Sequence, residues 1–134
     1  MKKILPALLL AMALLLSAAQ AVTTDASFDY QGIVSYAQGH YGEVYTLVGR
    51  VVQIEEYHRS SEENLVEEYT TLAVDDDPEQ IVCLHYTRPK NQMPMDPDVY
   101  VAALAYVDGV QRTGKVIVPL LEAKSDPIIL DQGN

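Results

Sequence analysis

The 134-residue sequence has no tryptophan, one phenylalanine and one cysteine, and its 9 lysine and arginine residues face 19 aspartate and glutamate residues. A single cysteine excludes an intramolecular disulfide framework. The formal net charge of −10 disfavours nucleic acid as the main partner, because binding a phosphate backbone needs clustered lysine and arginine. The length suits one small domain and excludes an enzyme with a separate cofactor-binding module.

The one long apolar run lies at the start of the chain. Met-Lys-Lys at 1–3 precedes an almost unbroken apolar stretch at 4–16, and Ala-Gln-Ala at 19–21 has the small-x-small form of a cleavage site. The run is shorter than the roughly 20 apolar residues of a membrane-spanning helix, and no lipid-attachment cysteine follows it. We therefore expect residues 1–21 to be a cleaved signal peptide and 22–134 a single exported domain, secreted or at the cell surface, with no retained membrane segment.

Residues 28–38 show a weak helical spacing, with Ser27 as a candidate N-cap and Gly39 as a candidate stop. From residue 44 the pattern changes, because β-branched residues recur over 44–54. Gly49 lies in the middle of this run. It indicates a bulge or sharp coil, which lets one strand serve two sheets or close a small barrel.

Further strands are predicted at 66–75, 80–86, 98–106 and 115–121. In the first of these, Thr70, Leu72 and Val74 share one face, and Glu68 has the same parity near the exposed end. The connections are expected as a hairpin with a solvated tip at 60–64, a tight turn at 75–78, a loop at 87–97 and a hairpin turn at 108–109. Residues 128–130 form either a short extra strand or the end of the fifth. The prediction is a mainly β fold, a small five-stranded closed or nearly closed barrel preceded by a short N-terminal helix, with a β-sandwich as the alternative.

The strand sequences also resemble a known family. They read Val-Gly-Arg-Val-Val-Gln at 48–53, Leu-Ala-Val-Asp-Asp at 72–76, Ile-Val-Cys-Leu-His-Tyr at 81–86, Asp-Val-Tyr-Val at 98–101 and Val-Ile-Val-Pro-Leu-Leu-Glu-Ala at 116–123. Over about residues 28–130 the chain is similar to small secreted or envelope-attached bacterial OB-fold domains, relatives of the tRNA-anticodon-binding-like OB superfamily. The resemblance implies that the barrel is OB-like.

OB barrels bind ligands on the face of strands two and three and in the flanking loops. In this sequence that rule selects Tyr69, Thr71, His85, Tyr86 and Arg88 as ligand-binding residues. Tyrosine rings stack on carbohydrate or peptide without a basic groove, whereas the glutamates around the first hairpin would repel phosphates. The alternative interpretation is that these tyrosines cover the ends of the barrel.

The remaining chemical groups do not form a strong motif. The acidic runs at 62–63 and 75–79 lack the spacing of a calcium loop, so they are predicted to be solvated turns rather than Ca²⁺ sites. The three histidines are scattered, and no metal site or cofactor is predicted. Cys83 and His85 project from the same face of a strand about 7 Å apart, too far for a nucleophile–base hydrogen bond. Cys83 is expected to be buried, and a hydrolase using it is the enzymatic alternative.

The sequence therefore predicts an exported, non-catalytic binding or accessory module. Its partner is an unidentified small ligand, glycan or protein, with carbohydrate or peptide favoured over nucleic acid. The alternative is a structural or assembly protein of the cell envelope, which docks through a barrel edge or through the N-terminal helix.

Overall fold

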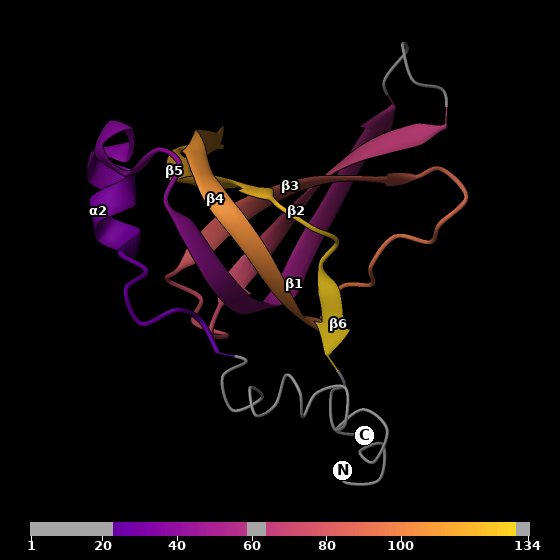
Figure 1. Cartoon of the computed structure of the whole chain (residues 1–134), viewed down its shortest axis with the longest axis horizontal. Helices are drawn as coiled ribbons and strands as arrows, with labels where there is room; N and C mark the ends of the chain where they lie inside the picture. Colours follow the sequence, from indigo (N-terminus) through magenta and orange to yellow (C-terminus); the bar gives the residue numbers. More distant parts are fainter. Residues whose placement is uncertain (1–22, 59–63, 131–134) are drawn as a thin grey trace, which may run out of the picture.

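The computed structural model describes residues 23–58 and 64–130. Two short helices precede the sheet, the α-helix α2 and a 3₁₀ helix η1, and six strands follow (Figure 1). The elements are α2 (Tyr30–Ser35), η1 (Ala37–His40), β1 (Val44–His58), β2 (Leu65–Val74), β3 (Ile81–Pro89), β4 (Tyr100–Thr113), β5 (Val116–Ala123) and β6 (Ile128–Leu130). The described part of the chain is mainly β with one short α-helix, as predicted. The predicted signal peptide and all but the last residue of the predicted hairpin tip at 60–64 lie outside the described residues.

All six strands belong to one sheet that closes on itself. Their order is β1-β2-β3-β5-β4-β6, and an additional pairing of β1 with β4 completes a ring of five strands. Every pairing is antiparallel except that of β3 with β5, which is parallel. The sixth strand pairs with the start of β4 and lies outside the ring. Residues 128–130 thus form the short extra strand, and the predicted count of five strands omitted it.

Strand β1 closes the ring because it pairs with two neighbours. Its first half pairs with β4 and its second half with β2, and at Gly49 the strand pairs with Val101 on one side and Val74 on the other. A side chain at Gly49 would place its Cβ 2.7 Å from the carbonyl oxygen of Ala73. The prediction that one bent strand serves two neighbours at Gly49 is confirmed. The accompanying bulge lies slightly later, between Val51 and Gln53.

The helical segment is shorter than predicted. The helix α2 covers only Tyr30–Ser35, and its N-cap is Asp29, whose carboxylate accepts a hydrogen bond of 3.0 Å from the Gly32 amide. Ser27 instead bonds the carboxylate of Asp25 two residues earlier. In Figure 1 α2 lies beside one end of β4 and β5, away from the far end of the paired strands β1 and β2. Neither helix in the described part of the chain has the length and apolarity that a membrane crossing requires.

The prediction of a hairpin turn at Asp108–Gly109 is wrong. Strand β4 continues through these residues to Thr113, and the register against β5 shifts between Val107 and Gly109. Gly109, with φ of 139°, therefore forms a bulge in a long strand, because its backbone geometry serves a bulge as well as a turn. The turn itself is the two-residue connection between Thr113 and Val116, where Gly114 has φ of 65°.

Apolar side chains from every strand of the ring fill its interior, joined by Ile33 of α2. Thr70, Leu72 and Val74 are all fully buried, which confirms the predicted inner face of β2. On β3 the inner residues are Val82, Leu84, Tyr86 and Arg88, and the alternate residues face outward. The wall formed by β2 and β3 therefore presents two chemically different surfaces.

Gly49→Ala tests the close approach that closes the ring. The added methyl group must displace the β2 backbone at Ala73, so we expect the free energy of unfolding to fall by about 1–3 kcal/mol in urea denaturation. Gln53→Ala, at an exposed position of the same strand, is the control and should stay within about 0.5 kcal/mol of the parent. Equal stability of Gly49→Ala and the parent would contradict this account of Gly49.

Candidate functional site

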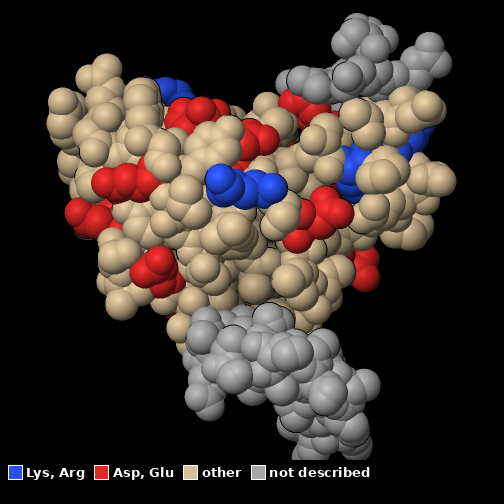
Figure 2. Space-filling view, viewed as in Figure 1, with Lys and Arg blue, Asp and Glu red and all other residues tan. Residues whose placement is uncertain are grey.

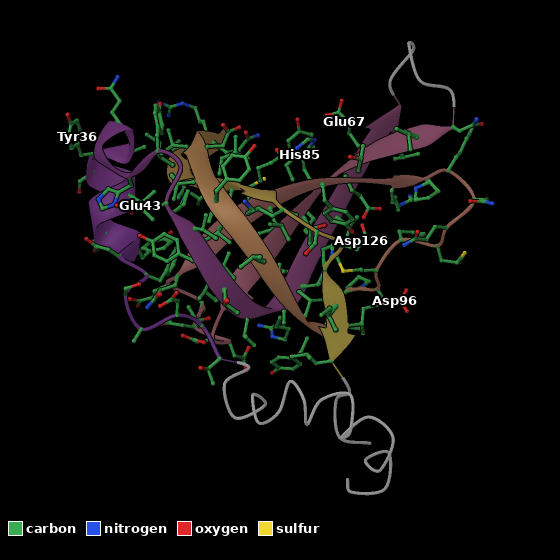
Figure 3. All side chains as sticks on the ribbon, viewed as in Figure 1. Tyr36, Glu43, Glu67, His85, Asp96 and Asp126 are labelled. Carbon is green, nitrogen blue, oxygen red and sulfur yellow. The ribbon has the colours of Figure 1, made fainter. Side chains whose placement is uncertain are left out.

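The outward face of β2, β3 and β5 carries a row of polar side chains that we call the outer row, consisting of Tyr69, His85, Glu122 and Glu67. Tyr69 lies opposite His85 in the β2–β3 register, and His85 lies opposite Glu122 in the β3–β5 register. The Tyr69 and His85 rings contact each other, with centroids 4.5 Å apart and planes tilted by 35°. Figure 3 shows Glu67 and His85 on the same outer side of the sheet.

His85 is fixed between two carboxylates. Its Nε2 lies 2.7 Å from Oε1 of Glu67, and its Nδ1 lies 2.6 Å from Oε1 of Glu122. Each of these two contacts is a hydrogen bond only if a proton lies between its two atoms. Either both ring nitrogens are protonated and donate to two carboxylates, or one nitrogen donates and the other accepts from a protonated carboxyl group. The imidazole therefore links β2 to β5 across β3 and presents a fixed ring beside Tyr69.

The inward face of the same strands carries a buried ionic group, the inner cluster of Glu68, Tyr86 and Arg88. Glu68 is fully buried, and its Oε2 accepts a hydrogen bond of 2.7 Å from Nε of Arg88, which is 5% exposed. The Tyr86 hydroxyl donates to the other carboxylate oxygen of Glu68. Burial raises the pKa of the Tyr86 phenol, and its hydrogen bond to Glu68 raises it further. Glu68, predicted near the exposed end of its strand, is instead among the most buried side chains.

Arg88 also fixes the segment after β3. Its Nη1 donates to the carbonyl oxygen of Gln92 at 2.6 Å and, more weakly, to that of Pro89 at 3.3 Å. Beside it lies a cavity of about 60 Å³, whose wall includes Tyr86, Arg88, Met95 and Asp126. The inner cluster therefore shapes a small cavity on the opposite side of β3 from the outer row.

The structure separates the five predicted ligand-binding residues into two groups. Tyr69, Thr71 and His85 face outward, and Tyr69 touches His85. Tyr86 and Arg88 face the interior with Glu68. The five residues were selected by strand number alone, whereas side-chain direction alternates along each strand, so one face cannot hold both His85 and Tyr86.

Three residues of these groups were not among the predicted site residues. Glu67 and Glu122 bind His85, and Glu68 binds Arg88. The parity of Glu68 with Thr70, Leu72 and Val74 was a usable signal for its burial. No local pattern indicates that Glu122 meets His85, because that contact depends on the parallel pairing of β3 with β5.

Another polar group lies where the 3₁₀ helix meets β1. The Glu43 carboxylate lies 2.7 Å from Nδ1 of His40 and accepts a hydrogen bond from the Tyr45 hydroxyl. The hydrogen bonds from Tyr45 and His40 lower the pKa of Glu43. Burial, together with the bond to Glu43 and its charge, raises the pKa of Tyr45 to about 12. This group ties the segment before β1 to the sheet.

Two further expectations concern metals and the cysteine. Among the side chains that the structure describes, those of residues 23–54, 64–112 and 114–130, no three histidine, cysteine, aspartate or glutamate side chains are arranged to hold a metal ion. Cys83 is 6% exposed, as expected for a small apolar side chain in this strand. Its burial denies solvent and substrate direct access to the thiol.

Comparisons with protein-family models, with curated proteins and with solved structures found no match to this chain.

The inner cluster can be tested with a pair of variants. Arg88→Met leaves the Glu68 carboxylate buried without its guanidinium, so we expect a loss of about 3–5 kcal/mol in the free energy of unfolding. Adding Glu68→Leu removes the unpaired buried carboxylate, and the double variant should therefore be more stable than Arg88→Met alone. Urea denaturation measures both, and a double variant at or below the stability of Arg88→Met would contradict a buried ion pair.

Tyr45 provides a pH test. Its pKa of about 12 in the folded protein exceeds the ordinary tyrosine value near 10, so the unfolded chain loses the phenolic proton first. The protonated Tyr45 phenol therefore contributes to the free energy of unfolding in full below about pH 10, and this contribution is lost as the pH rises toward 12. Between pH 8 and pH 12 the free energy of unfolding of the parent should therefore fall by up to about 2 kcal/mol more than that of Tyr45→Phe. Urea denaturation from pH 8 to 12 checks this, and parallel pH profiles would contradict it.

Proposed function

We propose that this chain is an exported, non-catalytic binding or accessory module built on an OB-like barrel. Support for the architecture comes from the strand order β1-β2-β3-β5-β4 with closure of β1 on β4. A five-stranded, partly open Greek-key barrel is the arrangement expected of an OB fold. Support for export comes from the sequence of residues 1–21, which has the three parts of a signal peptide.

The outer row is the observation that carries the binding function. It lies on the face of strands two and three that OB barrels use for ligands. The contact with Tyr69 and the two carboxylate bonds fix His85 before any ligand arrives. Such preorganisation favours binding, because less side-chain freedom is lost when the complex forms.

The chemistry of this face favours carbohydrate or peptide over nucleic acid. Tyrosine and imidazole rings can stack on a sugar ring or a peptide side chain, and glutamates accept hydrogen bonds from hydroxyl and amide groups. Acidic side chains are spread over the surface shown in Figure 2, with lysine and arginine in only a few places between them. A phosphate backbone would meet net repulsion on such a surface.

Tyr69→Ala tests the proposal. Glycan and peptide arrays probed with the parent chain identify a ligand, and its affinity is then measured by titration calorimetry. Because Tyr69 supplies stacking area, we expect Tyr69→Ala to weaken binding at least tenfold, or about 1.4 kcal/mol.

Tyr36→Ala is the matched control. Tyr36 is 64% exposed and follows α2, remote from the outer row (Figure 3), so its removal should leave the affinity unchanged. If the arrays yield no ligand, or Tyr69→Ala binds as tightly as the parent, the outer row is not a binding face.

The second candidate function is that of a structural or assembly protein of the cell envelope. The exposed edge of β6 favours it, since Ile128 and Ile129 are 54% and 56% exposed on a strand that, among the described strands, pairs only with β4. A second surface with exposed large hydrophobic side chains lies beside the helices, at Tyr36 and Tyr41. In the array experiment, loss of binding in Tyr36→Ala but not in Tyr69→Ala would favour docking through the helical segment.

A further inference from the structure

The cavity beside Arg88 has the size of a small functional group. Its volume is about 60 Å³. On this measure one water molecule needs roughly 10–15 Å³, so the cavity holds a group of about four to six non-hydrogen atoms. A whole sugar is too large to enter it, whereas the end of an extended side chain fits.

The charged groups described around the cavity favour a cation over an anion. The Arg88 guanidinium pairs with Glu68 at 2.7 Å, and it also donates to the carbonyl oxygen of Gln92. Asp126 is exposed, and its carboxylate in the wall has no ion pair or hydrogen bond with any other described residue. A second carboxylate therefore lies beside the Arg88–Glu68 ion pair.

The hydrogen-bonding groups point to a ligand that donates. The Tyr86 hydroxyl gives its proton to Glu68 and keeps lone pairs that accept. The Asp126 carboxylate is an acceptor only. An ammonium group, with three donors and a positive charge, satisfies both the charge and the acceptors.

The rest of the wall is apolar. Met93 and Met95 come from the segment after β3, and Ile129 comes from β6. Met95 is 8% exposed, while Met93 and Ile129 are largely exposed at the surface. Flexible methionine side chains adapt to an inserted alkyl chain, and lysine buries its aliphatic stem along such surfaces while its charged end meets polar groups.

From these observations we infer that the cavity beside Arg88 is a binding site for the side chain of a lysine carried by a partner protein or peptide. Beyond its Cβ a lysine has three carbons and one nitrogen in an unbranched chain, which fits the volume, whereas the six atoms of arginine, in a branched end, reach its upper limit. This site lies inside the wall, opposite the outer row across β3, so the inference goes beyond the proposed ligand face and does not depend on it.

The experiment uses n-butylammonium as the probe and the full chain labelled with ¹³C at the methionine methyl groups. The chain has four methionines, of which Met93 and Met95 line the cavity. We expect both signals to shift saturably with n-butylammonium at pH 7, and binding of the neutral n-butanol to be at least fivefold weaker. Butylguanidinium should also bind at least fivefold more weakly, because of its size.

Asp126→Asn should weaken n-butylammonium binding at least fivefold. The matched control is Asp96→Asn, which makes the same charge change at an exposed aspartate outside the cavity wall (Figure 3) and should leave the affinity unchanged. An unchanged ¹H–¹⁵N spectrum outside the cavity verifies the fold of each variant. The inference is overturned if n-butylammonium causes no saturable shift, if n-butanol or butylguanidinium binds equally well, or if the two aspartate variants behave alike. If the arrays yield no ligand for the outer row, this test is unaffected, since the two experiments monitor different residues.

Discussion

The pairing of β1 with both β2 and β4 is the constraint on which the rest of the structure depends. A strand of this length can bond to two neighbours only if it bends out of the plane of one pairing into the other, and at Gly49 it does so against the β2 backbone. Once the sheet is closed, each strand has an inside and an outside. The alternation of side chains then decides the surroundings of every residue of β2 and β3.

This closure explains why adjacent residues in the sequence have unlike chemistry. Glu67 and Glu68 are neighbours in β2, yet Glu67 meets His85 on the outward side of the sheet and Glu68 meets Arg88 on the inward side. His85 and Tyr86 in β3 separate in the same way. A binding face on this wall is therefore defined by residues two apart, and the inner cluster belongs to a different surface.

Much of the fold could be predicted from local pattern. The β-branched run around Gly49, the acidic turn at 75–78 and the inner parity of Thr70, Leu72 and Val74 are each encoded within a few residues, and the structure has them. The turn chemistry of Asp108–Gly109 was misleading because glycine with positive φ suits a bulge as well as a hairpin turn. The site was less predictable, since Glu122 reaches His85, 37 residues away in the sequence, through the parallel pairing of β3 with β5. Nothing near either residue in the sequence signals that contact.

The inner cluster is better explained by what it positions than by the stability it adds. Desolvation of Glu68 and Arg88 offsets much of their attraction, and well-packed apolar residues of similar volume would stabilise the interior as well or better. Nearby, the buried Thr70 hydroxyl has no close hydrogen-bond partner among the described residues, although its interaction with the Tyr86 hydroxyl lowers the pKa of that phenol slightly against the effect of burial. What the ion pair does provide is geometry. Arg88 holds the carbonyl oxygen of Gln92 while Glu68 holds Arg88 and Tyr86, and the position of the cavity wall follows from those bonds. An apolar replacement would keep the packing and lose the fixed polar wall, which is the part that a ligand would meet.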